Sequence, residues 1–170
     1  MPSVISKLRL LVYGSLLLFT GFTHGSIVTI RSLKPDSLRE SNPVIIDQTA
    51  IGQDLNLAAS TLMNCPAFRT QYPEKLPLLL KLGPIGFSYA PPTASRFDGA
   101  YAATPRGKRM MYLTRLFFEQ TRRARQAIIG HELMHILGLP ESVTHNTPYM
   151  NPETDPIYRL TYACFTELPQ

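Results

Sequence analysis

The apolar positions of the chain change their period along its length, and these periods predict where strands and helices lie. Residues 26–33 alternate around β-branched side chains, and residues 43–47 form a second apolar run after a polar turn, so both predict strands. Residues 54–63 place apolar side chains at helical spacing, with Asp54 where an N-cap is expected. Strand and helix periods in one chain of this length predict a single domain of the α+β class.

The whole chain has 15 prolines, and several of them divide its middle part. The apolar runs between them are short and predict brief strands or loops. Residues 85–89 are the best strand of this region. Residues 100–103 and 109–113 predict a β-hairpin, in which either strand can be the edge of a sheet. The prolines that bracket the short apolar runs are Pro73, Pro77, Pro84, Pro91 and Pro92.

The clearest helical period lies between residues 121 and 137. Apolar side chains occupy two opposite faces of this segment, and a helix that is apolar on both faces is buried. Gly138 and Pro140 predict its end. Residues 157–165 form a short segment after a stretch rich in turn formers, and they fit either a strand or a helix. We therefore expect one central, buried helix.

The first 25 residues have the layout of a secretory signal. Lys7 and Arg9 precede an apolar stretch at residues 10–19, and small residues follow near Gly25. The stretch is too short to span a bilayer comfortably. We expect cleavage near Gly25, a mature domain of residues 26–170 without stable membrane insertion, and a secreted or periplasmic location. An uncleaved anchor is the alternative.

Charge argues against a nucleic-acid partner. Removal of the signal takes away two basic residues and no acid, so the formal charge falls from +5 to +3. The basic clusters at residues 106–109 and 122–125 are short and lack interleaved aromatic residues. Such clusters are typical of a solvated face. We therefore expect no binding to nucleic acid. Separately, we expect the protein to be a monomer.

Cys65 and Cys164 are the only two cysteines of the chain. In an exported protein an even pair predicts a disulfide. This bridge would close a loop of about 100 residues, which corresponds to roughly 4–5 kcal/mol in the chain-entropy model. Two buried free thiols are the alternative.

His131, Glu132 and His135 form the pattern H-E-x-x-H within the predicted central helix. Residues four apart lie on one face of a helix, so the two imidazoles can converge on one Zn2+ ion. Glu132 projects about 100 degrees away and can act as a general base toward water without being a ligand. The pattern is short, but the three histidines after the signal all lie between positions 131 and 145, which argues against chance.

A catalytic zinc site needs a third protein ligand. Glu141 follows His135 by six residues and comes just after Gly138, which permits a sharp turn. His145 is the more usual type of zinc donor but lies ten residues beyond His135. The sequence favours Glu141 and leaves His145 as the alternative.

Residues 131–141 resemble the metzincin signature H-E-x-x-H-x-x-G-x-x-H/D, and are most similar to the small secreted snapalysin type, whose motif continues H-x-L-G-L-P-D. Glu141 stands where that family has a ligand Asp or His. Residues 148–152 resemble the Met-turn below the metal, with Met150 as its methionine. The resemblance extends over residues 98–152.

This resemblance implies a zincin fold, with a small twisted mixed sheet, a central buried active-site helix and an irregular C-terminal part that carries the Met-turn. It also implies that residues 100–103 form an antiparallel edge strand that binds the substrate backbone. The expected activity is that of a secreted zinc metalloendopeptidase acting on a peptide or protein substrate. A second hypothesis is an exported zinc-binding or interaction module, toxin-like or adhesive, without turnover. A third is a structural protein with a chance motif and no metal.

Overall fold

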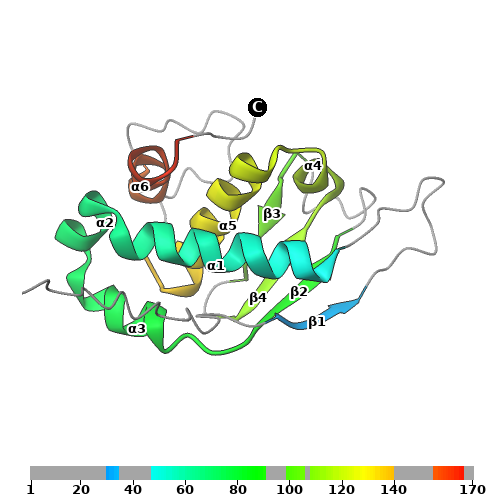
Figure 1. Cartoon of the computed structure of the whole chain (residues 1–170), viewed down its shortest axis with the longest axis horizontal. Coiled ribbons are helices and arrows are strands. Elements are labelled where there is room, and N and C mark those ends of the chain that lie inside the picture. Colours follow the sequence, from blue (N-terminus) through cyan, green and yellow to red (C-terminus); the bar gives the residue numbers. More distant parts are fainter. Residues whose placement is uncertain (1–29, 35–46, 91–98, 106–107, 140–154, 167–170) are drawn as a thin grey trace, which may run out of the picture.

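The fold is given by a computed structural model of the 170-residue chain, which describes residues 30–34, 47–90, 99–105, 108–139 and 155–166. The expected signal peptide, residues 1–25, lies outside these ranges. Among the described residues no helix has both the length and the apolar character needed to cross a bilayer. Figure 1 shows helices gathered around one small sheet, with α1 crossing in front of it.

The sheet has four strands in the order β1, β2, β4, β3. β1 (Ile30–Lys34) and β4 (Met110–Leu113) pair in parallel with β2 (Ile85–Tyr89), and β3 (Ala102–Ala103) pairs antiparallel with β4. The α+β class and the mixed sheet are therefore confirmed. The expected hairpin is present, and its first strand, β3, is the edge.

α1 (Gln48–Asn64) begins six residues earlier than its apolar period predicted. The carboxylate of Asp47 accepts hydrogen bonds from the backbone N–H groups of Thr49 (2.9 Å) and Ala50 (3.1 Å), which makes Asp47 the N-cap. The prediction that Asp54 caps this helix was wrong, because Asp54 lies inside the helix and is fully buried. Asp47 was also expected to end a strand; residues 43–46 of that strand lie outside the described residues.

The proline-rich middle of the chain contains short helices where strands or loops were expected. These are the 3-10 turn η2 (Pro73–Lys75) and α3 (Leu76–Leu80), and they follow α2 (Pro66–Gln71), for which no element was predicted. Each has a proline at its first or second position. Proline is favourable there, because its fixed φ suits a helix and its missing N–H would have had no partner in the first turn. Pro66, Pro73 and Pro77 therefore each lie in the first turn of a helix.

The predicted central helix is confirmed as α5 (Arg122–Ile136), which follows the short helix α4 (Arg115–Phe118). The hydroxyl of Thr121 accepts the backbone N–H of Ala124 at 3.2 Å and caps the helix. Gly138 ends it with a φ of 73 degrees, the left-handed conformation that glycine adopts most easily. Residues on opposite faces of α5 are buried, as its two apolar faces predicted.

Residues 157–165 form mainly a helix, α6 (Pro156–Cys164), which settles the choice that the sequence left open. Its N-cap is Asp155, which accepts the backbone N–H groups of Ile157 (2.8 Å) and Tyr158 (3.2 Å). At its other end Cys164 forms a disulfide with Cys65, so the predicted pairing is present and no described cysteine is free.

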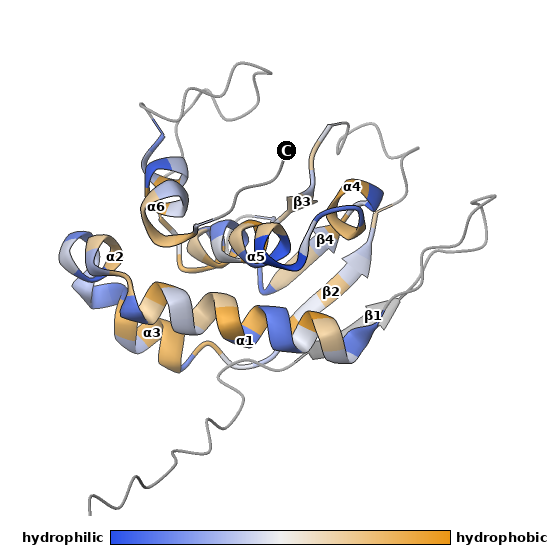
Figure 2. Cartoon of the chain, turned by 45° about the horizontal axis from the view of Figure 1, so that its top comes forward, coloured by the Kyte–Doolittle hydropathy of each residue, from blue (hydrophilic) through white to orange (hydrophobic). Residues whose placement is uncertain are grey.

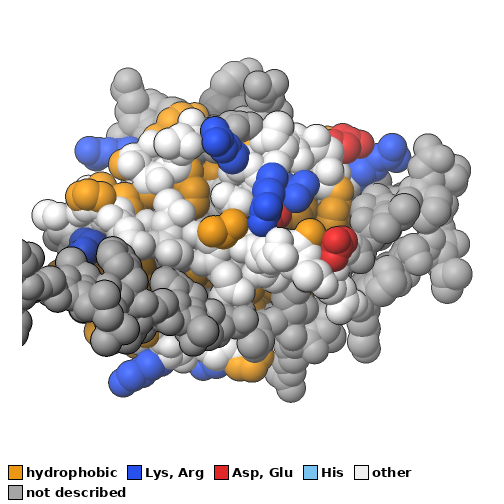
Figure 3. All heavy atoms as spheres, in the orientation of Figure 1, with side chains coloured by type: hydrophobic (Ala, Val, Ile, Leu, Met, Phe, Trp, Pro, Cys, Tyr) orange, Lys and Arg blue, Asp and Glu red, His pale blue; other side chains and the backbone are white. Residues whose placement is uncertain are grey.

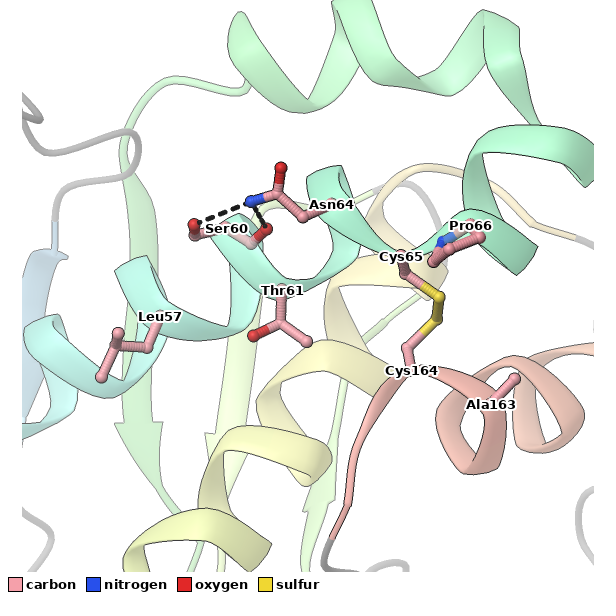
Figure 4. Close-up of a pocket in the computed structure, with 8 residues that line it drawn as sticks. All are labelled: Leu57, Ser60, Thr61, Asn64, Cys65, Pro66, Ala163 and Cys164. Carbon is pink, nitrogen blue, oxygen red and sulfur yellow. Dashed lines mark hydrogen bonds between the residues drawn. A yellow bond between two sulfur atoms is a disulfide. The ribbon is translucent and has the colours of Figure 1, made fainter.

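The disulfide joins the end of α6 to the junction of α1 and α2 (Figure 4). A hollow beside it is lined by side chains of α1 and α6, including Leu57, Thr61 and Ala163. Figure 1 places α6 and α2 together at the end of the molecule remote from β1. The bridge therefore anchors the C-terminal helix to the first half of the chain.

A buried carboxylate joins α1 to the start of α5. Asp54 accepts hydrogen bonds from Arg122 Nε (3.0 Å), Arg125 Nε (3.1 Å) and Gln126 Nε2 (3.3 Å). The Asp54 side chain has no exposed area, whereas those of Arg122 and Arg125 are 54% and 22% exposed. Figure 3 shows basic side chains gathered where α5 begins beside α1. The desolvation of this carboxylate is offset by three charge-assisted or polar hydrogen bonds.

Gly130, in the middle of α5, lies against the ring of Phe165. A Cβ atom added to Gly130 would overlap this ring. The glycine therefore allows the residue that follows α6 to contact the backbone of α5 directly. Phe165 is 8% exposed, so this contact belongs to the core.

We expect the double substitution Arg122→Met and Arg125→Met to lower the free energy of unfolding by about 3–5 kcal/mol, because it leaves the Asp54 carboxylate buried without its cations. Adding Asp54→Leu should recover most of this loss. Urea denaturation measures both effects. Glu119→Gln, which breaks an exposed pair with Arg115, is the control and should cost no more than about 0.5 kcal/mol. A further loss on adding Asp54→Leu would contradict this account.

We expect Gly130→Ala to destabilise the protein by about 1–3 kcal/mol through overpacking against Phe165. On helix propensity alone the same change would be favourable by about 1 kcal/mol. In a Phe165→Ala background the clash is gone, so Gly130→Ala should become neutral or stabilising. A double-mutant cycle in urea measures the coupling, and equal effects in both backgrounds would disprove the proposed clash.

Candidate metal centre

α5 presents the two imidazoles of His131 and His135 one turn apart, on a helix that is buried on both sides. Their Nε2 atoms are 3.1 Å apart, and the ring centroids are 4.8 Å apart with planes at 75 degrees. His131 is 8% exposed and His135 is half-buried. The helical spacing in the sequence thus places the two nitrogens close together.

The carboxylate of Glu132 belongs to the same cluster. One ligand atom from each of His131, Glu132 and His135 can be chosen so that all three lie within 4.8 Å of one another. Glu132 is 5% exposed. A helix therefore holds two nitrogen donors and one acid in a small, largely dry volume.

The donor set and its spacing fit zinc. Zn–N bonds of about 2.0–2.1 Å in a tetrahedral site put two nitrogen ligands about 3.3 Å apart. The observed 3.1 Å between the Nε2 atoms of His131 and His135 is close to this value. Imidazole is also a preferred donor for zinc. The two histidines can therefore hold zinc with little rearrangement of the helix.

The other nitrogen of His131 faces α6. Nδ1 of His131 lies 3.3 Å from Oγ1 of Thr161, and this hydroxyl donates to the carbonyl of Ile157 at 2.8 Å. The ring of Tyr158, also on α6, meets the His131 ring edge to face with centroids 4.7 Å apart. Two side chains of the C-terminal helix therefore fix the position of the His131 ring.

Tyr158 adds a protonated hydroxyl near the cluster. Burial raises the pKa of Tyr158 to about 12, and the carboxylates of Asp155 and Glu132 act in the same direction. Both effects disfavour the phenolate. The phenol therefore keeps its proton at neutral pH.

Thr161 and Tyr158 were not identified from the sequence. Both lie more than 20 residues beyond His135, and only the packing of α6 against α5 brings them to the site. The single sequence signal is that they are polar and three residues apart on a helix whose neighbouring positions Ile157 and Leu160 are buried. Such a pair can face a polar group inside a core.

The remaining residues predicted for the site are not placed by the structure. Glu141 and His145, the two candidates for the third ligand, and Met150 of the expected Met-turn lie in residues 140–154, outside the described residues. Their roles remain predictions. Among the described residues, the group that could hold a metal ion consists of His131, Glu132 and His135.

The edge strand β3 lies beside α5 (Figure 1). It is antiparallel to β4, with Ala102 opposite Leu113 and Ala103 opposite Tyr112. The hydroxyl of Thr114 donates to the carbonyl groups of Ala100 (2.7 Å) and Tyr101 (2.9 Å), which holds the start of this segment in place. An antiparallel edge strand was expected at residues 100–103, and the structure has it at Ala102–Ala103.

Comparisons of the chain with protein-family models, with curated proteins and with solved structures found no match.

Proposed function

We propose that this chain is an exported zinc-dependent endopeptidase that hydrolyses peptide bonds with Glu132 as the general base. The observation that carries the proposal is the 3.1 Å separation of the His131 and His135 Nε2 atoms beside the carboxylate of Glu132 on a buried helix. The mixed sheet with an antiparallel edge strand beside that helix supports a fold of the zincin type.

His131 and His135 would hold the zinc ion, with Glu141 as the third ligand and His145 as the alternative. When bound, zinc supplies a Lewis acid that lowers the pKa of water and polarises the carbonyl group of the substrate. Glu132 would take a proton from the attacking water as its oxygen bonds to the carbonyl carbon. The same carboxylate would then give this proton to the amine nitrogen as the C–N bond breaks.

Burial favours this role for Glu132. At 5% exposure its carboxylate has little bulk water around it, which strengthens its interactions with a reacting proton. The phenol of Tyr158 stays protonated nearby, because its pKa is raised to about 12. The surroundings of Glu132 therefore provide a neutral O–H group rather than a second negative charge.

The antiparallel edge strand β3 supports a peptide as the substrate. Backbone N–H and C=O groups on the outer side of an edge strand can pair with an extended peptide. β3 consists of two half-buried alanines and is the last strand in the sheet order of the described residues. Pairing there would lay a peptide beside α5, where the histidines lie.

The disulfide supports export. Bridges such as Cys65–Cys164 persist in oxidising compartments and are rare in the cytosol. This agrees with the secretory signal expected at residues 1–25. We therefore place the proposed activity in the periplasm or outside the cell.

Glu132→Gln should retain bound zinc while lowering peptide hydrolysis at least about 100-fold, because the amide keeps the size of the side chain but cannot accept the proton. Elemental analysis gives the zinc content, and a quenched peptide or casein, with and without a chelator, gives the activity. Glu119→Gln, at the exposed C-cap of α4, is the matched control and should remain active.

The same measurements separate the alternative functions. Stoichiometric zinc in the wild-type protein without chelator-sensitive hydrolysis would favour the binding or interaction module. An absence of stoichiometric zinc would favour a chance motif. Wild-type activity in Glu132→Gln would overturn the role of this residue.

Replacement of the third ligand should weaken zinc binding more than replacement of a neighbouring polar residue. We expect Glu141→Ala to reduce zinc affinity by more than about 100-fold. Loss of a residue that only hydrogen-bonds to a ligand reduces metal affinity by about 10–100-fold, so the loss of a ligand itself should exceed that range. His145→Ala should have a much smaller effect. Competition with a chromophoric chelator measures both constants, and the reverse order would assign the ligand to His145.

A further inference from the structure

Thr161 makes two contacts that together specify where its proton lies. Its Oγ1 is 2.8 Å from the carbonyl oxygen of Ile157 and 3.3 Å from Nδ1 of His131. A threonine hydroxyl has one proton, and a carbonyl oxygen can only accept. The contact of 2.8 Å has the usual length of an O–H···O hydrogen bond, so the proton is on that side.

The proton of His131 follows from this assignment. With its own proton used on Ile157, the Thr161 oxygen can only accept from Nδ1 of His131. Nδ1 therefore carries the hydrogen in the neutral imidazole, and Nε2 carries the lone pair. This is the tautomer that binds a metal through Nε2.

The contact between the two histidines requires a different tautomer for His135. Two Nε2 lone pairs 3.1 Å apart would repel each other, so a proton or a cation must lie between them. In the metal-free protein the proton then belongs to Nε2 of His135, which donates to Nε2 of His131. Metal binding would displace this proton and leave the tautomer of His131 unchanged.

We propose that Thr161 is a positioning residue that holds the proton of His131 on Nδ1 and so keeps the Nε2 lone pair directed at the metal. This inference deepens the proposed function and rests on the zinc site of His131 and His135. Thr161 acts through His131 and does not itself touch the metal or the substrate. The C-terminal helix is then part of the metal centre.

The position of Thr161 is well fixed by its helix. Asp155 caps the start of α6, and Cys164, three residues after Thr161, is bonded to Cys65. Phe165 then packs against Gly130 beside His131. Figure 2 shows α6 next to α5, as these contacts require. Thr161 is 5% exposed, so water does not readily replace it as the partner of Nδ1.

The first test uses the wild-type protein without metal. Long-range 1H–15N NMR correlations distinguish the two neutral tautomers of histidine. Spectra taken about two pH units above the ordinary histidine pKa of about 6.5 should show hydrogen on Nδ1 of His131 and on Nε2 of His135. Hydrogen on Nε2 of His131, or a mixture of tautomers there, would overturn the proposal.

The second test compares two substitutions at position 161. Thr161→Val keeps the shape but removes the acceptor, and should weaken zinc binding about 10–100-fold. Thr161→Ser restores the hydroxyl and should bind zinc nearly as the wild type does. The NMR spectrum of metal-free Thr161→Val should also show loss of the single His131 tautomer. Unchanged affinity and tautomer in Thr161→Val, or equal weakening in both variants, would refute the role.

These outcomes are separable from those for the proposed function. If the wild-type protein binds zinc but shows no chelator-sensitive hydrolysis, the peptidase proposal fails, while the zinc affinity and the His131 tautomer of Thr161→Val still decide the role of Thr161. If Glu132→Gln abolishes hydrolysis and Thr161→Val changes neither affinity nor tautomer, the peptidase proposal stands and the inference fails. Should Thr161→Val not fold, the wild-type spectrum decides.

Discussion

Burial of one imidazole and one carboxylate, those of His131 and Glu132, on a single helix is the constraint on which the rest of the structure depends. Polar groups taken out of water are stable only when they have partners, and His131 is met by Thr161 and Tyr158 from a different helix. The helix that carries them must also be held in place along its length. At its start, the fully buried Asp54 of α1 binds two arginines of α5. Farther along, the ring of Phe165 lies on Gly130.

The position of the C-terminal helix α6 is fixed by contacts with other parts of the chain. A helix of nine residues is too short to be stable alone in water. α6 is stabilised by the Asp155 cap at one end and by the Cys65–Cys164 bridge at the other. The disulfide thus does more than restrict the unfolded chain, because it keeps Thr161 and Tyr158 against His131. The proposed metal centre therefore depends on the Cys65–Cys164 disulfide, although neither cysteine is one of its ligands.

The sequence could predict those parts of the structure that depend on local periodicity. The buried helix from 122 to 136 and the strand from 85 to 89 have strong periods, and the spacing of His131 and His135 on a helix fixes their common face. Asp54 was misread because a cap and a buried ion-pair partner look alike locally, and its arginines lie 68 and 71 residues away. The contact of Thr161 with His131 was missed for the same reason, because the two residues are 30 positions apart in the sequence. Such contacts depend on tertiary packing, which no local period contains.

The division of tasks between α5 and α6 explains how a small domain could prepare the proposed metal site in advance. α5 places His131 and His135 one turn apart on the same face, which brings their imidazoles within reach of one ion. It does not decide which nitrogen of each ring carries a proton. That choice is made from outside, by the hydroxyl of Thr161 at Nδ1 of His131. On this account metal binding exchanges the proton between His131 and His135 for a cation, with the two nitrogens already near the spacing that zinc requires. A site prepared in this way loses little conformational entropy on binding, which favours affinity.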